Sequence, residues 1–449
     1  MRVFIDCSYV DFDRQPTGIP RVVLKYIEAG YRWGETRRVD VVPVVTTQAG
    51  LVPVRPIPGK IPPKSTLRYT GPVEEGDINL TDASPLLKEA SRALHAALSE
   101  AGMNAAMRSV EIEVLTLFGK LLSSANPVID IGSNDIVFFP AYWHDLNNKL
   151  LVDLKSTGAK LFVLVHDILP VRYKRFYQTP WREQFADNLL GACRVADGML
   201  AVSHYTANDV LKFSEESGVH LNDVKVFHNS SDSLINDPQV IRSIGDGSYL
   251  SSFQSKKKHE FLLAENPYLM VGTIEPKKGH IPVIKSFERL WRNGLERKLV
   301  LVGRRGWMDE DVILAIKASD FYEDKLFWFD DFTDVDLYFG YKYSRALIFS
   351  SYAEGFGIPL LEAAKSLLPM ICHDTEVARE VATSYALYYS TFDQFKSHIL
   401  TIENDNNYLE LKDSLSNFSW PSWQDTGTKL FDYFHSFIEE ETNGNFKVL

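Results

Sequence analysis

The chain has 449 residues, of which 45% are hydrophobic and 24% are charged, and its formal net charge is −11 at pH 7. This length favours two domains, and the acidic balance argues against nucleic acid as the main partner. The three cysteines are far apart, so they imply neither a disulfide framework nor a zinc site, and they fit a reducing cytoplasm. No apolar run approaches the length of a membrane span, and we expect residues 1–6 to form a core strand rather than a signal peptide.

Short apolar runs alternate with helical patterns along the chain, which is typical of parallel βα units. Strands in the first half are predicted at residues 2–7, 39–45, 136–139, 161–166, 198–202 and 224–228. Strands in the second half are predicted at residues 268–271, 299–302, 326–329, 346–349 and 369–373. The predicted fold class is therefore α/β, with two Rossmann-like doubly wound domains.

Two segments depart from this alternation. Residues 52–127 open with several prolines and then become helical, which indicates an insertion in the N-terminal domain. Residues 243–260 are polar and contain glycines, serines and three consecutive lysines, so we predict a linker between the domains.

Basic side chains gather between Arg14 and Arg38, where six of them stand against two glutamates. The favoured interpretation is a solvated helix face. The alternative is a weak docking surface for anionic lipid or a lipid-phosphate acceptor, which would bring peripheral contact with the inner membrane.

A polar pair, His166 and Asp167, ends the apolar run that begins at residue 161. Open α/β sheets place ligand contacts at the carboxyl ends of buried parallel strands. His166 could therefore hydrogen-bond a ligand hydroxyl or a phosphate oxygen, and Asp167 could orient it or contact a second substrate. A histidine that only caps the sheet edge is the alternative.

A glycine and two lysines follow the predicted strand at residues 268–271. Gly272 permits close approach of the backbone to a ligand, and Lys277 and Lys278 can reach a diphosphate. Gly303 and Arg304 form a similar but weaker signal after the next strand. A solvated helix start is the alternative explanation of the two lysines.

The richest pattern begins after the predicted strand at residues 346–349. A glycine-containing loop leads to a helix with Pro359 in its first turn, and backbone N–H groups at such a helix start attract an anion. Glu354 and Glu362 flank this anion site with seven residues between them. A phosphate cradle between two hydroxyl-binding carboxylates suits a nucleotide-sugar. A tight turn before an ordinary helix is the alternative.

This Glu-x7-Glu segment resembles the signature of retaining GT-B glycosyltransferases, in particular glycosyltransferase family 4. Other stretches resemble the same family: Thr17-Gly18-Ile19-Pro20-Arg21, Val165-His166-Asp167 with Pro170, and Gly272-Thr273 with Pro276-Lys277-Lys278-Gly279. The resemblance implies the GT-B fold, in which two Rossmann-like domains face a cleft.

The resemblance also implies roles for the candidate residues. Glu354 would contact hydroxyls of the transferred sugar, with His166 and Asp167 approaching from the N-terminal domain, and Glu362 would bind the ribose. The remaining donor-binding candidates are Gly18, Gly272, Thr273, Lys277, Lys278, Gly303, Arg304, Gly355, Phe356 and Gly357. Thr273 replaces an arginine found in many family members, so Lys277 or Arg304 is expected to supply the second positive charge. Arg21 and Ser203 are the acceptor-binding candidates, and Ser203 is equally suited to cap a helix.

Domain roles follow from the same resemblance. Residues 1–255 would be the acceptor domain, in which the insertion at about 52–127 either shapes acceptor choice or covers the sheet. Residues 256–425 would be the nucleotide-sugar donor domain. Residues 426–449 would form a C-terminal helix that packs back on the N-terminal domain.

The implied activity is transfer of a hexose from a nucleotide-sugar to a glycan or lipid-linked acceptor in bacterial surface polysaccharide synthesis, in the cytoplasm or peripherally on the membrane. GDP-mannose is the expected donor, and a dTDP- or UDP-linked sugar is the alternative. No cofactor and no metal are expected, although Asp11-Phe12-Asp13 resembles a metal-binding sequence. Two rival functions stay open: a GT-B nucleotide-sugar 2-epimerase, and a non-catalytic glycan or nucleotide-sugar binding module.

Overall fold

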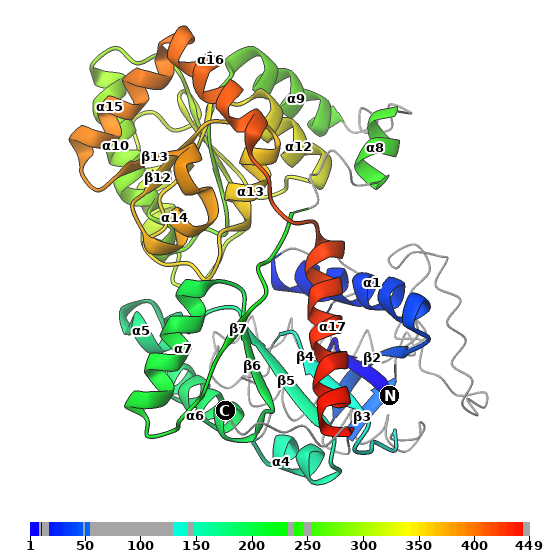
Figure 1. Cartoon of the computed structure of the whole chain (residues 1–449). Helices are drawn as coiled ribbons and strands as arrows, with labels where there is room; N and C mark the ends of the chain where they lie inside the picture. Colours follow the sequence, from blue (N-terminus) through cyan, green and yellow to red (C-terminus); the bar gives the residue numbers. More distant parts are fainter. Residues whose placement is uncertain are drawn as a thin grey trace, which may run out of the picture.

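The computed structural model describes residues 1–8, 10, 18–47, 50–53, 129–141, 148–231, 238–245 and 253–442. These residues form two α/β lobes, each built around one sheet (Figure 1). Nearly all of the predicted insertion lies outside the described residues, as does the Asp11-Phe12-Asp13 sequence.

The first sheet has the strand order β3-β2-β1-β4-β5-β6-β7. Its strands are β1 (Arg2–Asp6), β2 (Asp40–Thr47), β3 (Gly50–Pro53), β4 (Ile136–Phe139), β5 (Lys160–Val165), β6 (Gly198–Ala201) and β7 (Lys225–Val226). Neighbouring strands pair in parallel, except for the antiparallel pair of β2 with β3. The central strands are continuous apolar runs because helices cover both faces of the sheet.

The second sheet has the order β10-β9-β8-β11-β12-β13 and is parallel throughout. Its strands are β8 (Tyr268–Val271), β9 (Leu299–Val302), β10 (Leu326–Phe329), β11 (Ala346–Phe349), β12 (Met370–His373) and β13 (Ala386–Tyr389). The chain adds strands on one side of β8 and then crosses to the other side with β11. The crevice between the loops after β8 and β11 is therefore the topological switch point, where sheets of this kind bind ligands.

Helices connect the strands of both sheets. In the first lobe they are α1 (Ile19–Arg37), α4 (Asn148–Ser156), α5 (Leu169–Arg172), α6 (Thr179–Val195) and α7 (His204–Glu216). In the second they are α8 (Pro238–Gly245), α9 (Phe253–Glu265), α10 (His280–Arg292), α11 (Glu310–Lys317), α12 (Asp334–Tyr343), α13 (Ile358–Lys365), α14 (Glu376–Ala382), α15 (Phe392–Glu403) and α16 (Asp405–Ser414), with α8 packed against α12 (Figure 1). The described part of the chain includes no helix that combines the length and apolar character of a membrane span.

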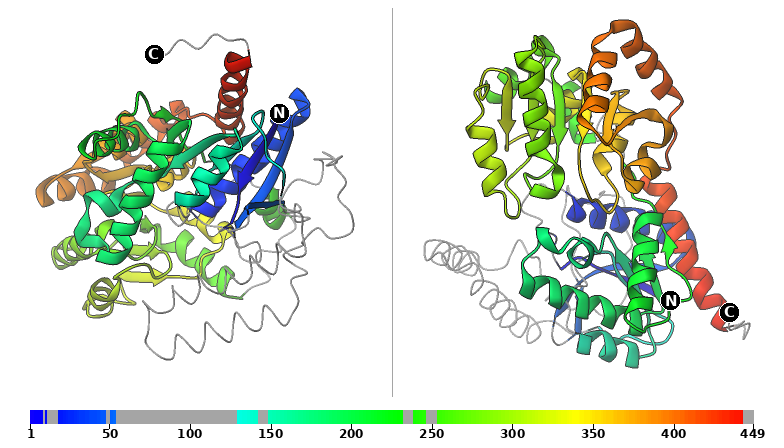
Figure 2. Two further views of the ribbon diagram at one scale, coloured as in Figure 1. Left: turned by 90° about the horizontal axis from the view of Figure 1, so that it is seen from below. Right: turned by 90° about the vertical axis from the view of Figure 1, so that its left-hand side faces the viewer.

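The last helix, α17 (Trp423–Thr442), leaves the second lobe and lies along α1 of the first (Figures 1 and 2). Two glycines permit this close contact, because a Cβ at Gly30 would lie 2.8 Å from Phe431, and one at Gly427 would lie 2.3 Å from Ala29. Phe434 of α17 also packs on the first sheet, with its ring 4.4 Å from that of Phe162. The helix therefore completes the core of the first lobe. It also returns the chain from the second lobe to the first, so the two lobes are connected by two chain segments.

The basic side chains of α1 are engaged in ion pairs. Lys25 and Arg32 both face Glu28, and Arg37 contacts Asp432 of α17 at 2.9 Å. These contacts fit the interpretation of a charged helix face, and the alternative of a docking surface for anionic lipid stays a prediction.

Each strand predicted from the sequence is present in the structure, within two residues of its expected bounds. Two strands were not predicted: β3, which carries Pro53 at an antiparallel edge, and β13, a short edge strand. The prediction of a linker at residues 243–260 is wrong in its second half, because α9 begins at Phe253. Lys258 of that helix is buried and pairs with Asp331 at 2.7 Å, and His259 stacks on Phe339.

Candidate active site

Two loops meet at the carboxyl edge of the second sheet, one after β8 and one after β11. The Ser350 hydroxyl donates to the carbonyl of Lys278 at 2.7 Å, and the Tyr352 amide donates to the carbonyl of Lys277 at 2.9 Å. Gly279 has φ 73°, and a Cβ there would lie 2.3 Å from the Ser350 carbonyl oxygen. Glycine is therefore required at this position, and the two loops form one unit at the switch point.

The centre of this unit is an ion pair between Lys278 and Glu354. The Lys278 ammonium donates to Glu354 Oε1, which also accepts a hydrogen bond from the Ser351 hydroxyl at 2.7 Å. Burial by itself raises the pKa of Glu354, but the neighbouring lysines and hydrogen bonds outweigh it and lower the pKa below its ordinary value. The carboxylate is therefore ionised at neutral pH although its side chain is only 13% exposed.

Lys277 lies on the same loop and faces the first lobe. Its ammonium contacts Glu275 at 3.3 Å and donates to the Tyr177 hydroxyl, also at 3.3 Å. Burial lowers the pKa of Lys277, but the charges of Asp167, Tyr177, Glu354 and Glu275 raise it overall. Lys277 therefore keeps its positive charge at neutral pH. Its electrostatic interaction with Asp167 places that predicted residue in the same site.

Helix α13 begins at the end of the β11 loop. Its N-cap residue, Gly357, has φ 94°, and no side chain caps the first turn, which contains Pro359. The uncapped amides offer hydrogen-bond donors and a partial positive charge to an anion. Phe356, by contrast, is buried with its ring 6.1 Å from His228 and 5.9 Å from Trp420, so its side chain supports the loop from behind.

The second glutamate of the motif, Glu362, is buried within α13. The Tyr341 hydroxyl donates to its Oε2 at 2.7 Å, and the Arg21 guanidinium lies 3.6 Å from its Oε1. Burial raises the pKa of Glu362 above its ordinary value, although Arg21 and Tyr341 oppose this effect. Arg21 also pairs with Asp334 at 2.6 Å, so this predicted acceptor-binding residue bridges the first lobe to two carboxylates of the second.

The carbonyl of Gly355 is held by the first lobe. It accepts hydrogen bonds from the Ser203 hydroxyl at 2.6 Å and the Thr206 hydroxyl at 3.2 Å. A Cβ at Gly355 would lie 1.8 Å from the carbonyl oxygen of His166, so only glycine permits this approach of the lobes. Ser203 is fully buried and also caps α7. A side chain that binds an acceptor must be accessible to it, whereas the Ser203 side chain is buried.

His166 lies at the end of β5, as predicted. Its Nε2 is 2.6 Å from the carbonyl oxygen of Pro140, which fixes the ring beside the carboxyl end of β4. The adjacent Asp167 accepts a hydrogen bond from the amide of Leu169 at 3.0 Å. Both residues therefore stand on the side of the first lobe that faces the Gly355 loop and Lys277.

The other predicted donor residues surround this centre. Gly272 has φ 149°. A Cβ at Gly303 would lie 1.9 Å from the carbonyl oxygen of Gly272, so the turn after β9 packs directly on the turn after β8. Thr273 and Arg304 are both exposed at this edge, and no ion pair of the Arg304 side chain occurs among the described residues. Gly18 has φ 60° at the start of α1, and no atom of the described residues lies within 4 Å of its potential Cβ.

Sequence reasoning missed one further bridge between the lobes. The Glu380 carboxylate of α14 accepts hydrogen bonds from the amides of His204 at 2.7 Å and Tyr205 at 3.0 Å, and it contacts His228 Nε2 at 2.8 Å. Tyr177 and Tyr341 were also missed. An ordinary glutamate or tyrosine carries no sequence signal for contacts that are set by how the two lobes meet.

The arrangement has a clear chemical capacity. Lys277, Lys278 and the first amides of α13 present positive charge to a diphosphate, while Glu354 and Glu362 present carboxylate oxygens to hydroxyl groups on either side.

Comparisons with known proteins relate the second lobe to a family of glycosyltransferases. Residues 251–418 match the family model of glycosyl transferases group 1 and form a domain of that family. The serotype-specific mannosyltransferase WbdA of Escherichia coli is 33% identical over 242 residues, which are 53% of this chain and 29% of that protein. The O-antigen chain mannosyltransferase B of Escherichia coli is 27% identical over 171 residues, which are 37% of this chain and 45% of that protein. The chain is homologous to these proteins, and the matched region spans less than a third of WbdA.

A solved structure with a similar fold aligns with most of the chain. The crystal structure of Anabaena Alr3699/HepE in complex with UDP and glucose aligns with a TM-score of 0.56 at 14% identity and covers 97% of this chain and 100% of that chain. The chain therefore has the GT-B fold of two Rossmann-like domains.

Proposed function

We propose that this chain is a retaining, metal-independent glycosyltransferase that moves a hexose from a nucleotide-diphosphate sugar to a glycan or lipid-linked acceptor in surface polysaccharide synthesis. The observation that carries the proposal is the pairing of Lys278 with Glu354 at the switch point of the second sheet. A cation suited to the leaving diphosphate lies there in direct contact with a carboxylate suited to sugar hydroxyls.

The choice of donor rests on the relatives. Mannosyltransferases of Escherichia coli and Salmonella typhimurium are similar in sequence, so mannose is the first sugar to test, carried by GDP. The structural neighbour Alr3699/HepE is described with UDP and glucose, so UDP-linked sugars are the main competitors.

In the proposed reaction, the bond between the sugar anomeric carbon and the diphosphate breaks through an oxocarbenium-like state. An acceptor hydroxyl attacks the same face, and its proton passes to the leaving phosphate oxygen. Lys277 and Lys278 stabilise the charge that develops on the diphosphate, and both are held by the loops at the switch point. Glu354 and His166 orient the sugar from opposite lobes.

A thermal-shift panel of GDP, UDP, dTDP and their sugar conjugates, with and without EDTA, tests this proposal. A ligand at a hundredfold excess over its dissociation constant stabilises the fold by roughly 2.7 kcal/mol. We expect GDP-mannose to raise the melting temperature equally in both conditions. No shift with any nucleotide would contradict the proposal. Analysis of the products formed from the donor alone tests the rival function, since an epimerised sugar in the absence of acceptor would favour the 2-epimerase.

A further inference from the structure

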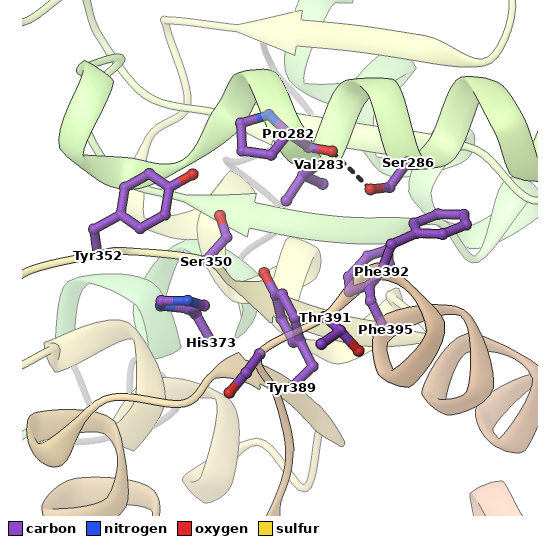
Figure 3. Close-up of a pocket in the computed structure, with 11 residues that line it drawn as sticks. Pro282, Val283, Ser286, Ser350, Tyr352, His373, Tyr389, Thr391, Phe392 and Phe395 are labelled. Atoms are coloured by element: carbon purple, nitrogen blue, oxygen red, sulfur yellow. Dashed lines mark hydrogen bonds between the residues drawn. The ribbon is translucent and has the colours of Figure 1, made fainter.

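A hollow of about 180 Å³ lies beside the candidate active site, with Ser350 and Tyr352 of the β11 loop in its wall (Figure 3). Its walls are the carboxyl ends of β11, β12 and β13 and the first turns of α10 and α15. Nothing in the proposed transfer reaction uses this hollow.

Aromatic rings and hydroxyl groups alternate around the hollow. The His373 ring lies 5.3 Å from the ring of Tyr352 and 5.7 Å from that of Tyr389. Figure 3 shows the hydroxyl groups of Ser350 and Tyr389 directed toward α10, beside the His373 ring, with Ser286 on the far wall. The hollow therefore combines flat apolar faces with hydrogen-bonding groups at their edges.

One of the polar atoms is unused within the described structure. His373 Nδ1 is buried and has no hydrogen-bond partner among the described residues. Its surface is closed to a water-sized group, so His373 lines the hollow through other atoms of its ring.

The charge of the lining excludes several ligand classes. None of the eleven lining residues is Lys, Arg, Asp or Glu, so the hollow lacks the cations that hold phosphate and the carboxylates that hold metal ions. Its volume corresponds to roughly six waters, far too little for a nucleotide-sugar. A small, neutral molecule with an apolar face and several hydroxyl groups matches both its size and its chemistry.

We propose that this hollow binds one neutral monosaccharide unit, as a carbohydrate subsite separate from the donor site. A pyranose ring presents aliphatic C–H groups on its faces and hydroxyl groups around its rim, which match the aromatic rings and the polar edges of the hollow. The proposal rests on the proposed function only in the choice of mannose as the first sugar to test.

The subsite is mechanically connected to the donor site. Ser350 and Tyr352 form part of its wall, and the same two residues hold the backbone of Lys278 and Lys277 by hydrogen bonds of 2.7 and 2.9 Å. A sugar bound in the hollow would therefore contact Ser350 and Tyr352, the residues that hold the backbone of both lysines.

Saturation-transfer NMR with methyl α-D-mannopyranoside on the full chain, in excess GDP, tests the proposal. Ser286→Phe fills the hollow from α10 and is expected to abolish the signal, whereas Ser397→Phe makes the same change on the exposed face of α15 and should leave it intact. His373→Phe puts a larger, fully apolar ring in the wall of the hollow, so we expect roughly tenfold weaker binding. Thermal melting checks that each variant folds.

Two outcomes would overturn the subsite. One is the absence of any signal from wild-type protein with methyl α-D-mannopyranoside or methyl α-D-glucopyranoside. The other is binding that neither Ser286→Phe nor His373→Phe weakens. A signal that appears without GDP and disappears in excess GDP would assign the sugar to the donor site instead and overturn the subsite. Failure of GDP to bind, with the signal still sensitive to Ser286→Phe, would contradict only the proposed function.

Discussion

Lys278 donates a hydrogen bond directly to Glu354, so the proposed phosphate-binding cation and the proposed sugar-binding carboxylate neutralise each other when no ligand separates them. Both side chains are largely buried, which strengthens their attraction relative to water. A donor must therefore replace this contact with two new ones, from its diphosphate to Lys278 and from its sugar to Glu354.

Glu354→Gln tests this competition. Because Lys278 loses its charged partner, we expect a nucleoside diphosphate without sugar to bind roughly fivefold more tightly, while turnover with the complete donor falls on the order of a hundredfold. Calorimetric titration with GDP or UDP and steady-state kinetics measure the two effects. Weaker binding of the bare diphosphate would show that the ion pair does not compete with the ligand.

Glu362→Ala is expected to act on binding instead. Removal of this carboxylate takes away the proposed ribose contact and one ion pair of Arg21, which also contacts Asp334, so we expect nucleotide affinity to fall roughly tenfold or more. Tyr341→Phe is the matched control, because it removes the hydroxyl that orients Glu362 but keeps the carboxylate. Equal losses of affinity in both variants would indicate a packing defect rather than a lost ribose contact.

The sequence predicted the strands well because buried parallel strands are continuous apolar runs, as at residues 346–349. It also placed Lys278, Glu354 and His166 after strand ends, where the structure has them, and strand ends meet at one edge of a sheet. Contacts between the lobes could not be predicted. Ser203 shows why, since the same sequence position suits a helix cap, a ligand contact or, as in the structure, a hydrogen bond to a distant carbonyl.

The error at residues 243–260 has a similar cause. A polar, lysine-rich composition favours a linker, but Lys258 finds Asp331 and the helix packs through His259 on Phe339. Tertiary contacts of this kind override local composition, and the sequence of the segment alone does not predict them.

Asp6 predicts a pH dependence of stability. Its carboxylate is buried at the end of β1, where the hydroxyls of Ser8 and Thr46 donate to Oδ1, and burial raises its pKa to about 6 from an ordinary 3.8. The folded state therefore binds this proton more tightly than the unfolded state, so stability is lost as the pH rises from about 4 through 6. The difference between the two pKa values lowers the free energy of unfolding by on the order of 3 kcal/mol above pH 6.

Asp6→Asn removes this charge but keeps an oxygen that can accept both hydroxyls. We expect the variant to be more stable than wild type at pH 7.5 and to lose most of that advantage at pH 4.5, as measured by urea denaturation at both values. Asp153→Asn, on the exposed side of α4, serves as a control for a surface aspartate. An Asp6→Asn variant that is less stable at pH 7.5 would mean that the carboxylate is required in its ionised form.

Gly355→Ala tests whether the contact between the lobes is needed for catalysis. The new Cβ would lie 1.8 Å from the carbonyl oxygen of His166 and 2.9 Å from the Asp167 side chain, so the lobes must separate. Because His166 would then move away from Glu354, we expect turnover to fall on the order of a hundredfold. Nucleotide affinity should change only a few-fold, since most of the proposed donor contacts belong to the second lobe.

Small-angle scattering should show a larger radius of gyration for Gly355→Ala, and steady-state kinetics should separate its turnover from its nucleotide affinity. Gly132→Ala is the matched control, because a Cβ there meets no atom of the described residues within 4 Å. Ser203→Ala should have a smaller effect in the same direction, since the Gly355 carbonyl keeps its hydrogen bond from Thr206. If Gly355→Ala keeps both the wild-type dimensions and the wild-type turnover, the lobes do not need this contact, and the sugar must be oriented by the second lobe alone.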